Sequence, residues 1–317
     1  MLANAMVQQE ATIDIQAVRE SLKTYIETTG KTQSEIARSV GVSGSRISQF
    51  LKGTYPGDNE QLAYSLQQMM SVDTRRQQTV KKPGFVVTTT AKEVATVARY
   101  THEHTDIGVV YGPAGIGKTM ALQQYAQEYP SVVFITVDVT TSRAKALLEE
   151  IADKIGTKSS GTQAAIKRGI VSELRGSGRM VILDEAQHLT YEALEALRTI
   201  LYDACGVGIL LCGNETIYSN MVGKRNAPFA QIFSRVGINR GIGKKVSLED
   251  IRKIVCQDLP VSEECVQYFH SVANSNGGIR LAVKLFVLAW ETANRIGEPI
   301  NLDILASASE FLMQHNA

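Results

Sequence analysis

One short run of residues has the composition needed to hold the phosphates of a nucleotide. It lies between an apolar stretch at 107–112 and an amphipathic stretch at 120–128, and it consists of Gly112, Pro113, Ala114, Gly115, Ile116, Gly117, Lys118 and Thr119. This spacing matches the P-loop, in which glycines let backbone N–H groups close around phosphates at a helix N-terminus. We predict that these residues and the following Met120 bind ATP. Lys118 is predicted to contact the β- and γ-phosphates, both for binding and for catalysis, and Thr119 is predicted to bind Mg²⁺.

Polar side chains follow two further apolar stretches. Asp184 and Glu185 end the stretch at 180–185, and Asn214 follows the stretch at 208–213. Asp184 is predicted to bind Mg²⁺, and Glu185 to orient or deprotonate the water that attacks the γ-phosphate. Asn214 is predicted to lie between the P-loop and the carboxylates, near the γ-phosphate.

The elements that must position these residues alternate between strands and helices. Short apolar runs at 107–112, 132–137, 180–185 and 207–213 are separated by amphipathic stretches. Apolar strands joined by helical crossovers predict an α/β fold, with a parallel sheet covered by helices on both faces. From residue 247 onward only helical patterns remain.

This set of motifs resembles the AAA+ P-loop ATPases. The resemblance implies that Asn214 takes part in catalysis by sensing the γ-phosphate, and that Arg280 contacts the nucleotide from a C-terminal helical lid. It also implies a catalytic arginine that closes a helical segment and acts on the neighbouring subunit's nucleotide. Arg235 is the candidate, and Arg225 and Arg240 are the alternatives.

The first 70 residues have a helical pattern that indicates DNA binding. Thr32 and Glu35 form a capping box that begins one short helix, Gly41 ends it, and Ser43 caps the next. This stretch resembles the helix-turn-helix of phage repressors, whose second helix enters the major groove. The predicted DNA contacts are Ser43, Ser45, Arg46 and Gln49. The alternative is a helical bundle that contacts only proteins.

Charge is balanced overall but not locally. The chain has 33 Lys and Arg residues against 32 Asp and Glu residues, so a global basic excess is absent. Residues 139–180 nevertheless carry eight basic and four acidic side chains, and residues 218–253 carry eight and two. Arg143 and Lys145, just after the second predicted strand, are expected to contact DNA phosphates.

The chain is therefore predicted to divide into four parts. These are a helix-turn-helix domain at 1–70, a basic linker at 71–90, an AAA+ core at 91–246 and a helical lid at 247–317. A solvated hinge without a DNA role is the alternative for the linker.

No apolar run approaches the roughly 18 residues of a membrane span, and the N-terminus lacks a leader pattern. A cytoplasmic protein without a membrane partner is expected.

The order of the motifs resembles the Mu B family of phage transposition proteins over nearly the whole chain. The resemblance is carried by DNEQL at 58–62, GPAGIGKT at 112–119, ILDEAQHL at 182–189, GNETIYSNMVG at 213–223 and FAQIFSRV at 229–236. It implies an ATPase that assembles as a helical homo-oligomer on double-stranded target DNA, recruits and activates a DDE-type transposase, and leaves the DNA on hydrolysis. A helicase loader or replication initiator, and an ATP-responsive repressor, remain as alternatives.

Overall fold

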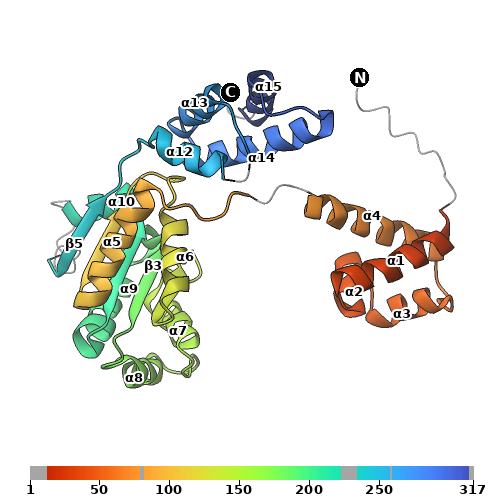
Figure 1. Cartoon of the computed structure of the whole chain (residues 1–317). Helices are drawn as coiled ribbons and strands as arrows, with labels where there is room; N and C mark the ends of the chain where they lie inside the picture. The colour runs from red at the N-terminus through yellow and green to blue at the C-terminus, as the bar shows by residue number, and fades with distance from the viewer. Residues whose placement is uncertain (1–12, 79–81, 223–233, 258, 314–317) are drawn as a thin grey trace. The chain divides into compact units, whose positions relative to one another are not determined.

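The chain folds into two compact units, Met1–Val80 and Lys81–Ala317. The computed structural model describes residues 13–78, 82–222, 234–257 and 259–313 (Figure 1). Each unit has its own hydrophobic core and is described separately.

The described part of the first unit is all helical. Its helices are α1 (Ile15–Thr29), α2 (Gln33–Val40), α3 (Gly44–Lys52) and α4 (Asn59–Gln78). Apolar residues spaced three or four apart on each helix meet in one core, because that spacing places them on one helical face. The most deeply buried members of this core are Leu22, Ile36, Ile47, Phe50 and Leu66.

The helix ends around α2 follow the predicted signals, with one difference. Thr32 and Glu35 form a reciprocal capping box, and the hydrogen bonds from Thr32 lower the pKa of Glu35. Gly41 ends α2 in the left-handed region, at φ 74°. Ser43 occupies the N-cap position of α3, but its hydroxyl caps no backbone N–H and lies 2.9 Å from the Ser45 hydroxyl.

The stretch at 71–90, predicted to be a linker, is shorter in the structure. Helix α4 continues to Gln78 because no glycine or proline interrupts residues 59–78, and the loss of apolar periodicity does not itself end a helix. Helix α5 (Thr89–His104) begins before the stretch ends, with the Thr88 hydroxyl as its cap.

The second unit is built on a parallel sheet, as predicted. Its described strands have the order β2-β3-β4-β1-β5. They are β1 (Ile107–Tyr111), β2 (Val132–Thr136), β3 (Met180–Asp184), β4 (Gly208–Gly213) and β5 (Val236–Gly241).

Strand β5 was not predicted. Arg235 is expected to close a helical segment, but the strand begins directly after it at Val236, and residues 223–233 lie outside the described part of the chain. Its sequence, VGINRG, has two glycines and mostly exposed side chains, so no apolar run marked it as a strand.

Helices cover both faces of the sheet (Figure 1). Helices α5 and α6 (Lys118–Glu128) pack on one face. The other face is covered by α7 (Ala144–Lys154), α8 (Gln163–Leu174), α9 (Tyr191–Ala196) and the π-helical continuation of α9, η2 (Leu197–Cys205).

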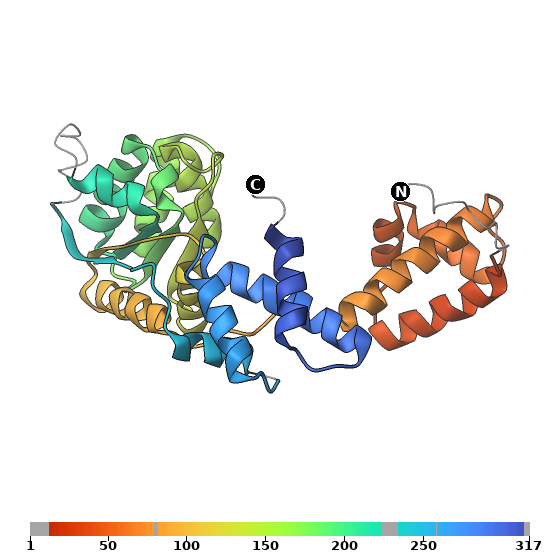
Figure 2. The ribbon, with the colours of Figure 1, turned by 90° about the horizontal axis from the view of Figure 1, so that it is seen from above.

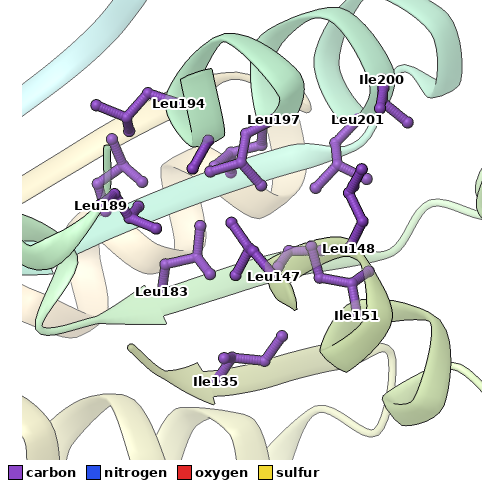
Figure 3. Packing of buried hydrophobic residues seen from close by; sticks show 14 of the residues in the cluster. Ile135, Leu147, Leu148, Ile151, Leu183, Leu189, Leu194, Leu197, Ile200 and Leu201 are labelled. Carbon is purple, nitrogen blue, oxygen red and sulfur yellow. The ribbon is translucent and has the colours of Figure 1, made fainter. Parts of the chain in front are cut away.

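Alternation along the strands explains the two layers. On β3, Val181 and Leu183 enter the core with α7 and η2, whereas Met180 and Ile182 enter the core with α5 and α6. Figure 3 shows side chains of the first core, where Leu147 and Leu148 of α7 meet strand and η2 residues.

The helices after β5 form a group of their own, which we call the lid (Figure 2). They are α12 (Leu248–Val255), α13 (Glu263–Ala273), α14 (Gly278–Ile296) and α15 (Leu302–Met313). Ser247 caps α12 as predicted. The Thr89 N–H donates a bifurcated hydrogen bond to the two oxygens of the buried Asp250 carboxylate of α12, at 3.0 and 3.1 Å, and so ties the lid to α5. No helix in the described ranges is long and apolar enough to cross a membrane.

Phe50 tests whether the two units are energetically separate. We expect Phe50→Ala to reduce the stability of the first unit by about 3 to 5 kcal/mol, because the ring is fully buried. Denaturant unfolding should show this loss while ATP affinity stays unchanged. Tyr64→Ala, at a side chain that is 59% exposed, is the control and should have little effect. An equal loss of ATP affinity in Phe50→Ala would contradict the separation.

Candidate active site

Parallel pairing brings the predicted polar residues to one edge of the sheet. Tyr111 at the end of β1 pairs with Gly213 at the end of β4, and Leu183 near the end of β3 pairs with Leu211. The residues that follow these strands therefore leave the sheet side by side, at the edge where open α/β sheets bind ligands. Strand β4 lies between β3 and β1, as predicted from the position of Asn214.

The P-loop threonine contacts the strand acid directly. The Thr119 hydroxyl donates a hydrogen bond of 2.8 Å to Oδ2 of Asp184, whose carboxylate is 2% exposed. A hydroxyl and a carboxylate this close fit Mg²⁺, which prefers oxygen ligands and keeps several waters or phosphate oxygens in its shell. Both residues predicted to bind metal thus come together.

Lys118 begins α6 and is folded back onto the P-loop. Its ammonium donates to the carbonyl oxygens of Gly112 at 2.9 Å and Pro113 at 2.8 Å. Burial lowers the pKa of Lys118, although the nearby acidic groups Asp184 and Glu185 partly oppose this effect. A buried cation of this kind is stabilised by any anion that enters the loop.

Glu185 adopts an unusual backbone conformation at the end of β3. Its φ of 57° lies in the left-handed region, which only Thr105 shares among the described non-glycine residues. The Glu185 carboxylate is exposed and accepts a hydrogen bond of 2.5 Å from the Gln187 side-chain amide. The Gln187 amide oxygen in turn accepts from the Asn214 N–H at 3.3 Å.

Asn214 also begins α10 (Glu215–Val222). Its side-chain oxygen accepts from the Thr216 N–H at 2.8 Å, so its amide nitrogen is the part left for contacts outside the helix.

Gln187 was not singled out from the sequence. Its position two residues after the predicted base was the available signal.

One cavity of about 560 Å³ collects these groups, a volume typical of small-ligand sites. Asp184, Glu185 and Asn214 line it. Among the residues predicted to bind the nucleotide, those that line it are Gly112, Ala114, Gly115, Gly117, Lys118, Thr119, Met120 and Arg280. Pro113 and Ile116 do not: Pro113 offers its carbonyl to Lys118, and the Ile116 side chain is buried in the core.

Part of the cavity lining is apolar and was not predicted. Pro83, Phe85 and Val86 line it from the stretch interpreted as a linker, so this part of that stretch belongs to the site. Lid residues complete the apolar lining, namely Ile254, Ile279 and Val283. The apolar triplet Phe85-Val86-Val87, directly after Gly84, was the signal for this role.

The lid touches the P-loop through glycines. A Cβ on Gly115, whose φ is 80°, would lie 2.4 Å from the Gly277 carbonyl oxygen. The Arg280 N–H donates to the Gly115 carbonyl at 3.2 Å, and a Cβ on Gly278 would lie 2.9 Å from that same oxygen. Only glycine lets the two backbones approach this closely.

The three candidate arginines differ in their surroundings. Arg235 precedes β5, is 53% exposed and lies 3.9 Å from Asp203, a long ion pair. Arg240 on β5 donates to Glu93 at 3.0 Å. Arg225 lies outside the described residues.

The residues predicted to contact DNA are exposed. Arg143 and Lys145 begin α7, where Lys145 also forms an ion pair of 3.6 Å with Glu149. In the first unit, the exposed candidates on and before α3 are Ser43, Ser45, Arg46 and Gln49. None of these residues lines the cavity.

Known proteins resemble the chain in sequence and fold. Residues 101–221 match the family model described as an AAA domain. The chain is 32% identical to the ATP-dependent target DNA activator B of Escherichia phage Mu, covering 93% of this chain and 95% of that protein. It is 29% identical to the Mu-like prophage FluMu DNA transposition protein B of Haemophilus influenzae, over 84% of this chain and 93% of that protein.

A solved structure supports the fold. The ORC2 protein of Aeropyrum pernix, in ADPNP and ADP complexes, matches with a TM-score of 0.53 at 19% identity. The match covers 72% of this chain and 69% of that one. The AAA+ fold class inferred from the sequence is confirmed.

Gly115 provides a direct test of the contact between the lid and the P-loop. We expect Gly115→Ala to weaken binding of a fluorescent ATP analogue by at least about tenfold, because the new methyl group would collide with the Gly277 carbonyl at a strained φ. Gly243→Ala is the matched control, since its Cβ would meet open space. Equal affinities for both variants would show that the close contact is dispensable.

Proposed function

Because the chain belongs to the family of ATP-dependent target DNA activators of Mu-like phages, we propose that it couples ATP to target-DNA binding and transposase activation. The observation that carries the proposal is that the P-loop, the acidic pair, Asn214 and the lid line the same cavity. The same chain carries a separate helical unit whose helix α3 exposes polar side chains.

In the proposed hydrolytic step, each polar group in the cavity has one task. Lys118 would leave the P-loop carbonyls to bind the β- and γ-phosphates, and Thr119 and Asp184 would hold Mg²⁺. When bound, this ion neutralises charge on the phosphate oxygens. Glu185 accepts a hydrogen bond from the attacking water and orients it, and the Asn214 amide contacts the γ-phosphate.

The apolar end of the cavity is proposed to hold the adenine base. Phe85 and Val86 offer one apolar wall, and Ile254 and Val283 offer another from the lid. Since the base contacts both the core and the lid, and Arg280 lines the phosphate end, a bound nucleotide holds the two together.

Arg235 is proposed to complete the site of a neighbouring subunit. The register pairs Val236 with Ile107 at the start of β1, whereas the P-loop follows the other end of this strand. Five residues of strand span about 16 Å, so Arg235 lies at the opposite edge of the sheet from its own P-loop. It therefore acts only in a neighbouring copy, which requires a homo-oligomer.

We propose that this oligomer is a helical filament on double-stranded DNA. Arg143 and Lys145 are exposed cations that neutralise DNA phosphates, and Ser43, Arg46 and Gln49 meet the groove or backbone through the first unit. Contacts to phosphates carry no sequence information, and we propose that they dominate, so that binding is non-specific. Hydrolysis weakens the contacts between subunits and disassembles the filament after the transposase has been recruited.

Lys118 tests the link between ATP and DNA. We expect the parent protein to bind duplex DNA with ATP at least about tenfold more tightly than without it, and the affinity to fall with salt. Lys118→Ala should lose the ATP effect, as measured by fluorescence anisotropy. Lys92→Ala, at an exposed position outside the cavity, serves as the control. If Lys118→Ala binds DNA as the parent does in ATP, the proposed coupling fails.

Arg235 can be tested by mixing variants. Arg235→Ala and Lys118→Ala should each hydrolyse ATP at least about a hundredfold more slowly than the parent. A mixture of the two should regain activity, because an intact P-loop in one subunit then meets an intact arginine in another. Arg240→Ala, tested in the same mixtures, decides between the two described candidates. Recovery with Arg240→Ala but not with Arg235→Ala would reassign the role.

A further inference from the structure

We infer that Gln187 is a positioning residue that sets the orientation of the Glu185 carboxylate according to the location of Asn214. The inference rests on the proposed role of Glu185 in activating water. It adds a link between Glu185 and Asn214, which both line the cavity.

Both ends of the Gln187 amide are engaged. Its Nε2 donates to Oε2 of Glu185 at 2.5 Å, and its Oε1 accepts from the Asn214 N–H at 3.3 Å. A primary amide carries a donor and an acceptor on one rigid plane. Moving the acceptor side therefore moves the donor side, and the carboxylate bonded to it follows.

The surroundings of Gln187 hold it in this position. It lies in the short helix η1 (Ala186–His188), whose turn is closed by the His188 N–H donating to the Glu185 carbonyl at 3.1 Å. The neighbouring Ala186 is buried, which anchors the turn to the core. On the other side, a Cβ on Gly213 would lie 2.2 Å from the Gln187 Oε1, so the amide reaches β4 only because residue 213 is glycine.

This arrangement gives Gln187 a task that neither Glu185 nor Asn214 performs alone. The Glu185 carboxylate is exposed and would otherwise sample several rotamers, only some of which face the attacking water. Because Asn214 is the group proposed to contact the γ-phosphate, its N–H shifts with the presence of that phosphate. Gln187 transmits this shift to the carboxylate, so the base is aligned when ATP, rather than ADP, is bound.

Two substitutions separate the two ends of the amide. Gln187→Met keeps the length of the side chain but loses both hydrogen bonds, whereas Gln187→Glu keeps an acceptor for the Asn214 N–H and loses the donor to Glu185. We expect both variants to lower kcat at least about tenfold while KM for ATP changes less than about twofold, because neither removes a group proposed to bind phosphate. His188→Ala, an exposed neighbour in the same turn that does not line the cavity, should keep the parent kcat.

Hydrogen exchange of the Asn214 backbone N–H supplies a readout that does not depend on turnover. In the nucleotide-free protein, exchange should be faster in Gln187→Met than in the parent, and close to parental in Gln187→Glu. Melting temperatures identify any general loss of structure, and a fluorescent ATP analogue measures binding directly.

The outcomes separate this inference from the proposed role of Glu185. If Glu185→Gln hydrolyses ATP at the parent rate, the role proposed for Glu185 is wrong. If Glu185→Gln is inactive but Gln187→Met keeps the parent kcat, the inference about Gln187 alone is wrong. A fall in kcat matched by an equal loss of ATP affinity would also overturn it, since Gln187 would then support binding rather than alignment.

Discussion

The parallel pairing of β3, β4 and β1 is the constraint on which the ATP site depends. Gly213 lies opposite Tyr111, and the ladder continues into the P-loop, where the Gly112 N–H donates to the Gly213 carbonyl at 3.3 Å. A slip of one residue along β4 would exchange the side chains that face its two cores and displace Asn214 by about 3.3 Å. The burial of β4 on both faces therefore fixes the catalytic geometry as well as the fold.

Residues in local motifs were predictable from the sequence. The P-loop, Asp184 and Asn214 could be placed because each follows an apolar strand, and parallel strands deliver such residues to one edge. Phe85 and Gln187 have only weak local signals, because their roles depend on how separate segments meet in space. Strand β5 was missed for a different reason: an edge strand with one solvated face needs few apolar residues.

The lid and the core share one site although their sequence patterns differ. The contact between Gly115 and Gly277 is made by backbone alone, and the hydrogen bond that the Thr89 N–H donates to Asp250 fixes a second point. These two contacts hold the N-terminus of α14 against the P-loop and α12 against the start of α5. Both helices are therefore fixed to the core near the segment that precedes α5. The apolar residues Phe85 and Val86 lie on this segment, which is why the stretch interpreted as a linker is part of the machinery.

The hydrogen bonds of Lys118 to its own loop have a kinetic consequence. With its ammonium held by the carbonyls of Gly112 and Pro113, the nucleotide-free P-loop satisfies its own cation. The conformational entropy that the P-loop loses on becoming ordered is lost when the unit folds. It is not lost again each time a nucleotide binds. Nucleotide exchange then requires an exchange of hydrogen-bond partners and not a local refolding step.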